Sequence, residues 1–373
     1  MARVLFVAHG MGDHPPGWEA KVVAQLDALL SEYPKYKGQS HPFSTRVIIE
    51  PITYDAIFDK YVQQWGQQRS ALAEFAQSNG MELQGVLGLL GSGQLPADMT
   101  SALWETFLDP VLYRGTLLGE RVLQCVTDQL RTRWTHHLNV ATRTGESVEV
   151  SVLAHSLGTM VMSEALAVVG ENRDGKFPGL ASAVQRIELF VTLANVSQLG
   201  PRKLQRINSL ETVVRPTSAP AASHGLSNYI AHFINARHQY DPFCFWQRFD
   251  PTGWGKGYEL IDALDHFHDA LPHGFAHYLA HPLVHIPLFR RLLGNGAITK
   301  PHEAAALKAF NPLPAANACA TPLRELRAEC ALLRELTTSD SASLDDFVRR
   351  GLRIMQAART AHAQCLQLPE GSF

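Results

Sequence analysis

The chain has 373 residues, of which 46% are hydrophobic and 18% are charged, and its formal net charge is −2. This composition is typical of a globular protein and excludes a disordered chain, and the length allows one large domain with insertions. No run of Lys or Arg resembles a nucleic-acid-binding tail, so we expect no nucleic-acid partner.

We expect neither a signal peptide nor a membrane span. The opening run "MARVLFVAHG" is too short for the apolar core of a signal peptide, and no run reaches the ~18 apolar residues of a membrane span. The five cysteines are scattered and form no C-x-x-C pair. Reduced thiols and a cytoplasmic location are therefore predicted.

The first half of the chain predicts two strands and a long insertion. Apolar, β-branched runs over residues 3–9 and 46–54 predict buried strands, and the first is closed by the glycines of "HGMG". From residue 56 the apolar spacing becomes helical, and "LQGVLGLLGSGQLP" then interrupts it. A further helix is predicted over about 117–134.

The second half alternates strands with helices. "SVEVSVLA" predicts a strand that ends at Ser156, and the apolar run after it predicts a helix stopped by Gly170. Further strands are predicted over residues 186–194, 229–236 and 257–267, and helices over 282–293 and from Thr321 and Ser343 onward.

This alternation predicts an α/β fold with a mostly parallel sheet covered by helices on both faces. We expect one domain over residues 1–296, with a helical cap insertion at about 56–139, and a C-terminal helical extension over 297–373. Ligands of such sheets bind at the carboxyl ends of the strands, so the residues that follow each strand are the candidates for a site.

Three of these strand ends carry reactive side chains. The strand at 148–155 leads into "AHSLG" with Ser156, the strand at 229–236 leads to Asp241, and several histidines follow the last strand. With "HGMG" after the first strand, this pattern resembles the α/β-hydrolases, chiefly lipases and esterases. "FINARHQYDPF" is similar to the segment around the acid in intracellular phospholipases and related lipases.

The resemblance covers about residues 3–293 and implies a Ser-His-Asp triad in the chain order nucleophile, acid, histidine. Ser156 is then the nucleophile and Asp241 the acid, while His9 and Gly10 belong to the oxyanion loop. His155 holds a place that is common in lipases and is expected to face away from the base. The usual Gly-x-Ser-x-Gly has alanine at position 154, which is small enough for the turn.

The spacing has a steric reason. A serine on a sharp strand-to-helix turn is held in strained backbone angles that lift its hydroxyl above the sheet. The helix that starts near Leu157 points its N–H groups at the site and favours a developing negative charge. We expect the amides of Leu157 and Met11 to bind the oxyanion.

The base is either His273 or His277. Pro272 and Gly274 keep His273 on a loop, which favours it, and His277 is the rival. Four histidines recur at a spacing of four, which would form one face of a continuous helix; they are His273, His277, His281 and His285. Prolines interrupt that series and no H-E-x-x-H motif is present, so neither a metal nor a cofactor is expected. Asp250, Asp262 and Asp265 are the rivals of Asp241.

The sequence thus predicts a serine hydrolase that cleaves carboxylic esters through an acyl-enzyme. The apolar segment 84–94 of the insertion is interpreted either as a lid that favours lipid-like esters or as ordinary packed core. The expected partner is a small-molecule or lipid ester, with peripheral membrane contact. The alternatives are a non-catalytic interaction protein and a phospholipase effector.

Overall fold

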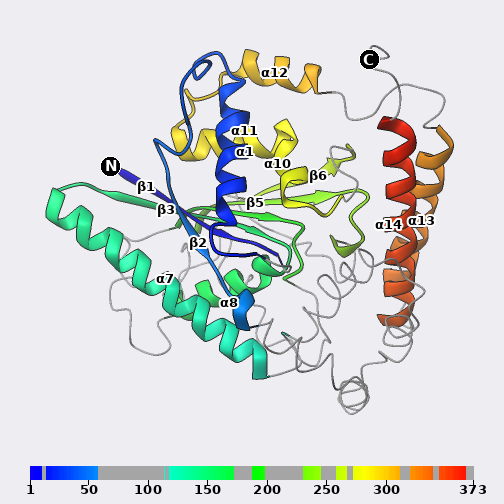
Figure 1. Ribbon diagram of the computed structural model, residues 1–373, viewed down its shortest axis with the longest axis horizontal. Helices are drawn as coiled ribbons and strands as arrows, with labels where there is room; N and C mark the ends of the chain where they lie inside the picture. Colours follow the sequence, from blue (N-terminus) through cyan, green and yellow to red (C-terminus); the bar gives the residue numbers. More distant parts are fainter. Residues whose placement is uncertain are drawn as a thin grey trace, which may run out of the picture.

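The computed structural model describes residues 1–10, 14–57, 113, 117–171, 187–197, 230–244, 258–266, 272–310, 320–338 and 344–366. Its centre is a six-stranded sheet in the order β2-β1-β3-β4-β5-β6 (Figure 1). The strands are β1 Ala2–Ala8, β2 Ile48–Ile52, β3 Val148–His155, β4 Ile187–Leu193, β5 Ile230–His238 and β6 Tyr258–Leu264. Every neighbouring pair is parallel, which confirms the predicted α/β class.

The strand order reverses direction between β1 and β3. From β1 the chain first adds β2 on one side and then adds β3 to β6 on the other side. Ala8 at the end of β1 pairs with Ala154 near the end of β3. The two loops that leave these strands therefore start side by side, at the kind of switch point where parallel sheets bind ligands.

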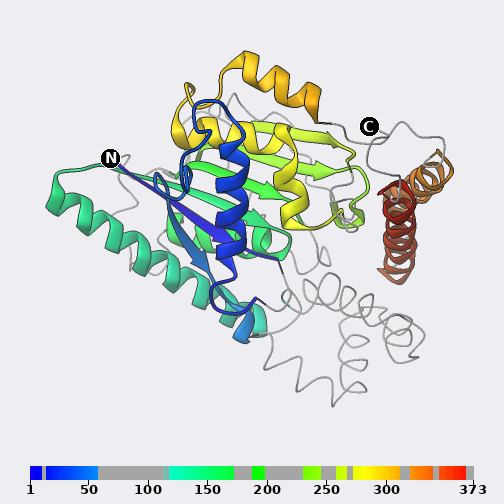
Figure 2. The same ribbon diagram turned by 45° about the horizontal axis from the view of Figure 1, so that its top comes forward.

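Helices cover both faces of the sheet (Figures 1 and 2). On one face lie α1 (Glu19–Ser31), α10 (Phe275–Ala280) and α11 (Pro282–Leu293), which pack into one hydrophobic cluster with the sheet. On the other face lie α7 (Leu117–Thr144) and α8 (Leu157–Glu171), which pack into a second cluster. Helix α7 buries one apolar stripe, which includes Val122, Val126 and Leu130, whereas α8 is buried on almost all sides.

Several element boundaries differ from the sequence predictions. The helix predicted to end near Trp134 continues to Thr144, because Leu138 and Ala141 extend its apolar stripe. Helix α8 passes through Gly170 and ends at Glu171. The prediction did not include α1, α10 or the helix α12 (Lys300–Ala309).

The cap insertion predicted at 56–139 is described only in part. Its last portion is α7, which contacts β2, β3 and α8 and so belongs to the layer that covers the sheet. The apolar segment 84–94, interpreted as a lid or as packed core, lies outside the described residues.

The C-terminal helices pack against the sheet domain. Helix α12 contacts α11, while α13 (Ala320–Thr338) and α14 (Leu344–Leu366) form a pair beside the carboxyl end of β5 (Figure 1). Helix α14 contacts the short 3-10 helix η3 (Pro242–Cys244), and Arg327 of α13 donates a hydrogen bond to the Tyr240 hydroxyl. Among the helices of the described part, none has both the length and the apolar character needed to cross a bilayer.

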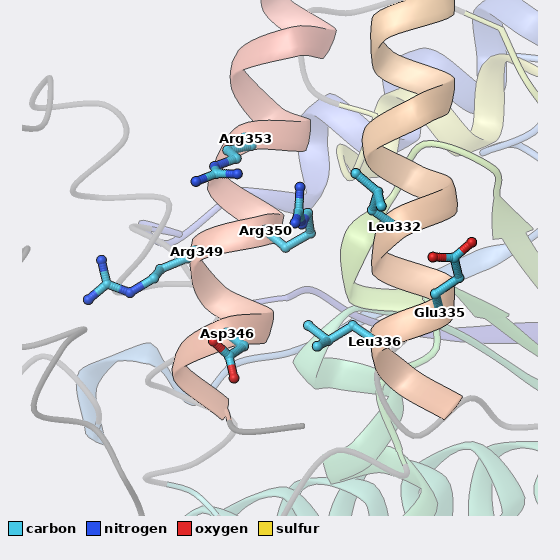
Figure 3. Close-up of a pocket in the computed structure, with 7 residues that line it drawn as sticks. All are labelled: Leu332, Glu335, Leu336, Asp346, Arg349, Arg350 and Arg353. Carbon is cyan, nitrogen blue, oxygen red and sulfur yellow. The ribbon is translucent and has the colours of Figure 1, made fainter. Parts of the chain in front are cut away.

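A pocket of about 350 Å³ opens between α13 and α14 (Figure 3). It is lined by Leu332, Glu335, Leu336, Asp346, Arg349, Arg350 and Arg353. Arg350 of this set donates to Glu329 at 2.7 Å across the helix pair. Ser156, Asp241 and His273 are not among the residues that line this pocket.

Candidate functional site

Ser156 occupies the sharp turn between β3 and α8. Its φ is +53°, a left-handed conformation that non-glycine residues rarely adopt and that is typical of strained functional turns. Its backbone N–H donates to the carbonyl of Leu193 at the end of β4, which fixes the turn to the sheet. Helix α8 starts at the next residue, so its N-terminus faces the serine.

Two close approaches explain the small residues around Ser156. A Cβ atom on Gly10 would lie 2.7 Å from the Ser156 Cβ, so the loop after β1 passes directly beside the serine. A Cβ on Gly158 would collide with the carbonyl oxygen of His9. Ala154 is fully buried, in agreement with the small residue that the turn requires.

His273 lies between Ser156 and Asp241. Its Nε2 is 2.7 Å from the Ser156 Oγ, and its Nδ1 is 2.9 Å from the Asp241 Oδ2. The structure thus brings together three residues that follow three different strands. A serine, an imidazole and a carboxylate in this order can transfer a proton away from the hydroxyl and stabilise the imidazolium that results.

Asp241 is fully buried and accepts several hydrogen bonds. Its Oδ1 accepts from the backbone N–H of Phe243 at 3.1 Å, and its Oδ2 accepts from the Tyr278 hydroxyl at 2.7 Å. Burial, and then the nearby Asp241 charge, raise the pKa of Tyr278 well above its usual value, so this hydroxyl remains a donor. These donors satisfy the oxygens of a carboxyl group that is buried from solvent.

His155 supports the loop that carries His273. Its ring stacks on Phe275 at 5.2 Å, and its Nε2 donates to the backbone carbonyl of His273 at 2.5 Å. The prediction that His155 faces away from the base was wrong, because the two imidazole centroids are 5.0 Å apart. Burial, followed by the proximity of His273, lowers the pKa of His155 well below its usual value, so its ring is neutral.

The backbone N–H groups of Leu157 and Met11 are the two predicted oxyanion donors. Leu157 is buried at the first position of α8, next to Ser156. Met11 lies outside the described residues, but Gly10 immediately before it is in contact with the serine.

His277, the rival base, lies in a buried cluster with His238 and His266. Its Nε2 is 3.2 Å from His238 Nε2, and its ring stacks on His266 at 4.2 Å. The hydrogen bonds of these rings join the loops that follow β5 and β6 to α10: His238 bonds to the carbonyl of His266, and His266 bonds to the carbonyl of His277. This cluster supports both loops that position Asp241 and His273.

The three clustered imidazoles are close enough together to suggest a metal site. However, His238 Nδ1 accepts from the backbone N–H of Tyr240 at 3.2 Å, so its proton is on Nε2, where a metal would have to bind. A metal-bound histidine usually donates from its second nitrogen instead. The hydrogen bonding therefore favours rings that bond to one another and to the backbone over a metal site at these three residues.

The remaining candidates have other partners. The Asp262 Oδ2 lies 3.4 Å from a guanidinium nitrogen of Arg237. Asp265 is half-buried, and burial raises its pKa above the usual value. Asp250 lies outside the described residues. The histidines spaced by four do not form one helical face, because His281 is the N-cap of α11 and accepts from the N–H of Leu283.

The buried histidines predict a loss of stability in acid. Burial lowers the pKa of His285 to about 4, against ~6.5 for an unfolded histidine. Below pH ~6.5 the unfolded chain binds this proton and the folded chain does not, so stability falls with pH. His285 alone accounts for a loss on the order of 3 kcal/mol by pH 4.

Denaturant unfolding at pH 7 and pH 4 measures this effect. His285→Gln, which cannot titrate, should show a smaller difference between the two pH values than the wild type. An equal difference in the two proteins would contradict the assignment. Tyr33, whose hydroxyl is 2.7 Å from His285 Nε2, is the neighbour that the variant perturbs at both pH values.

Comparison with known proteins gives one family match. Residues 114–201 match a family described as "Putative serine esterase (DUF676)". The match covers about a quarter of the chain and includes Ser156 with the β3–α8 turn, whereas Asp241 and His273 lie beyond it. No curated protein matches the chain. The family match supports hydrolase activity of the serine-esterase kind.

Proposed function

We propose that the protein is a serine hydrolase of the α/β-hydrolase fold that cleaves carboxylic esters. The observation that carries this proposal is the position of His273, with one nitrogen 2.7 Å from the Ser156 Oγ and the other 2.9 Å from the Asp241 carboxylate. The family match at the serine turn and the parallel sheet that presents it support the same conclusion.

The reaction has two steps. The Ser156 Oγ bonds to the ester carbonyl carbon while His273 Nε2 takes the hydroxyl proton, and the carbonyl oxygen becomes an oxyanion. His273 then gives that proton to the alcohol oxygen as the C–O bond breaks, which leaves an acyl group on Ser156. In the second step, a water molecule bonds to the acyl carbon while His273 Nε2 takes a proton from it. His273 then returns that proton to the Ser156 Oγ as the acyl–oxygen bond breaks, and the carboxylic acid is released.

The negative charge in these steps is held by amides. We assign the N–H of Leu157, at the N-terminus of α8, and the N–H of Met11, which follows Gly10, as the two oxyanion donors. The close approach of Gly10 to Ser156 supports this assignment, because it shows that the loop after β1 reaches the serine.

The substrate class that we propose is an acyl or lipid-like ester, with peripheral lipid contact. The apolar insertion suggests this preference, and a phospholipase effector would share the same chemistry. A non-catalytic interaction protein would have no need of an imidazole within hydrogen-bonding distance of both a serine hydroxyl and a buried carboxyl group. The cytoplasmic location stays a prediction from the cysteine pattern.

A fluorophosphonate probe together with an ester panel tests the proposal. The probe is expected to label the wild-type protein on Ser156, and the panel of short- and long-chain acyl esters, thioesters and phospholipids defines the substrate. Failure of the probe to label Ser156, with no ester in the panel hydrolysed, would overturn the proposal and favour an interaction module.

Asp241→Asn should lower kcat by about four orders of magnitude with little change in KM. The amide cannot stabilise the imidazolium, and it favours the tautomer of His273 that carries its proton on the wrong nitrogen. Initial-rate kinetics measures the loss. Asp262→Asn is the matched control, since Asp262 pairs with Arg237, and it should retain kcat within about twofold. Equal rates for wild type and Asp241→Asn would exclude Asp241 as the acid.

A further inference from the structure

The hydroxyl of Tyr278 lies between the end of β5 and the carboxyl group of Asp241. Its oxygen is 3.0 Å from the backbone nitrogen of His238 and 2.7 Å from the Asp241 Oδ2. An amide N–H can only donate, so the hydroxyl oxygen accepts from His238 and directs its single proton to the carboxylate. The direction of both hydrogen bonds therefore follows from the chemistry of the partners.

The same carboxylate oxygen contacts the base. Asp241 Oδ2 is 2.9 Å from the His273 Nδ1, so this oxygen accepts from both the imidazole and the hydroxyl. The other oxygen, Oδ1, accepts from the N–H of Phe243 at 3.1 Å, and the Cys244 thiol, at 3.4 Å from Oδ2, is a weak donor in comparison. Each oxygen thus has a donor besides His273, and these donors together fix the rotation of the carboxyl group about its Cβ–Cγ bond.

The two donors come from different parts of the chain. The Phe243 N–H belongs to the same turn as Asp241 and moves with it. Tyr278 instead lies on α10, the helix that directly follows the turn with His273. Tyr278 therefore joins the acid to the segment that carries the base, through a second hydrogen bond beside the one that His273 itself makes.

The ring of Tyr278 holds this hydroxyl in place. The residue is fully buried, and its ring meets the imidazoles of His155 and His238 edge-on, with centroids 6.2 Å and 6.1 Å away. It belongs to the hydrophobic cluster that α1, α10 and α11 form with the sheet. A closely packed interior leaves such a ring little freedom to shift. The core therefore sets the position of the hydroxyl and, through the hydrogen bond, the orientation of the carboxylate.

We propose that Tyr278 is a positioning residue for ester hydrolysis, which holds the Asp241 carboxylate in the orientation that faces His273. This inference rests on the proposed function, because it assigns a role in the same reaction. Tyr278 acts through Asp241 alone. The carboxylate that it orients stabilises the imidazolium that forms when His273 takes the serine proton.

The role predicts an effect on kcat rather than on KM. The imidazolium forms only as the serine attacks, so a misoriented carboxylate destabilises the transition state and leaves substrate binding nearly unchanged. Removal of one hydrogen bond to a charged group corresponds to a change of about 10- to 100-fold in rate. The loss should be smaller than that of Asp241→Asn, because the Phe243 N–H still holds the other carboxylate oxygen.

Tyr278→Phe tests the role, because it removes the hydroxyl and keeps the packed ring. Tyr33→Phe is the matched control, since Tyr33 is another buried tyrosine and its hydroxyl lies 2.7 Å from the buried His285 Nε2. The kcat, KM and Tm are measured for each protein. Active sites are counted with a fluorophosphonate, carried to complete labelling, so that kcat is expressed per labelled serine.

A double-variant cycle separates positioning from a structural role. Tyr278→Phe is also made in the Asp241→Asn protein, in which no carboxylate is left to orient. If Tyr278 acts through Asp241, the second change should lower kcat there by no more than about twofold. A role in the packing of α10 alone would give the same factor in both backgrounds.

For Tyr278→Phe alone we expect kcat per labelled serine to fall about 10- to 100-fold, with KM within about twofold. Tyr33→Phe should keep kcat per labelled serine within about twofold. An unchanged kcat for Tyr278→Phe, or an equal loss in the wild-type and Asp241→Asn backgrounds, would overturn the inference. A Tyr278→Phe protein without folded structure by circular dichroism would also overturn it, because the hydroxyl would then serve the fold.

The proposed function and the positioning role fail in different ways. If the wild type hydrolyses esters and is labelled on Ser156 while Tyr278→Phe keeps full kcat, only the positioning role is lost. If the wild type is neither labelled nor active, the proposed function itself fails.

Discussion

Ser156→Ala is expected to reduce kcat for ester hydrolysis by about five to six orders of magnitude, while the fold is retained. The variant has no oxygen to bond to the carbonyl carbon, so no acyl-enzyme forms. The residual rate reflects whatever the oxyanion donors achieve with water as the nucleophile. Initial-rate kinetics with the best ester of the panel measures the loss, and circular dichroism confirms the fold.

Ser163→Ala is the matched control for this variant. Ser163 is another buried serine of the same region, on α8, and its hydroxyl donates to the carbonyl of Thr159. Its replacement should leave kcat within about twofold. If Ser156→Ala keeps the wild-type rate, hydrolysis occurs at another site and the serine turn has a different purpose.

His273→Ala is expected to lower kcat about as much as Ser156→Ala, because nucleophile and base act as one unit. The double variant should be no slower than either single variant, since the second change removes nothing that still functions. A double variant that loses the product of the two single effects would show that Ser156 and His273 act independently. That result would contradict their shared proton transfer.

His277→Asn separates the two histidines that the sequence offered as bases. His277 belongs to the buried cluster with His238 and His266, so its replacement should lower the Tm by removing a support of the two loops. The rate per labelled serine should fall by no more than a few-fold. A loss equal to that of His273→Ala, with an unchanged Tm, would instead identify His277 as the base.

The architecture was predictable because buried parallel strands are continuous apolar runs. The run before Ser156 is of this kind, and β3 ends at the predicted place. Helix α1 was missed although Val22, Leu26 and Leu30 are spaced by four and buried in the structure. That signal was present in the sequence, since two parallel strands need a crossover, usually a helix, between them.

The sequence favoured His273 over His277, because Pro272 and Gly274 keep His273 on a loop, but it did not exclude His277. Both lie within five residues of one another after the last strand, and both are buried or partly buried. What separates them is a change of backbone direction at Gly274, where α10 begins. His273 precedes the helix and reaches Ser156, whereas His277 lies on the helix and points to His238, and such a turn depends on tertiary packing.

Tyr278 was also missed. It lies on α10, and nothing in its local sequence indicates that its hydroxyl contacts Asp241. A support of this kind is set by packing between elements that are distant in the chain.

In the proposed reaction, the acyl group of the ester is carried transiently by Ser156. The most direct measurement is to quench a reaction with a slowly deacylated ester and locate the acyl mass by peptide mapping. We expect one acyl group per molecule, on the peptide that contains Ser156, and none in Ser156→Ala or His273→Ala. An acyl group on a different residue, or rapid hydrolysis with no acylated protein under rapid quenching, would contradict it.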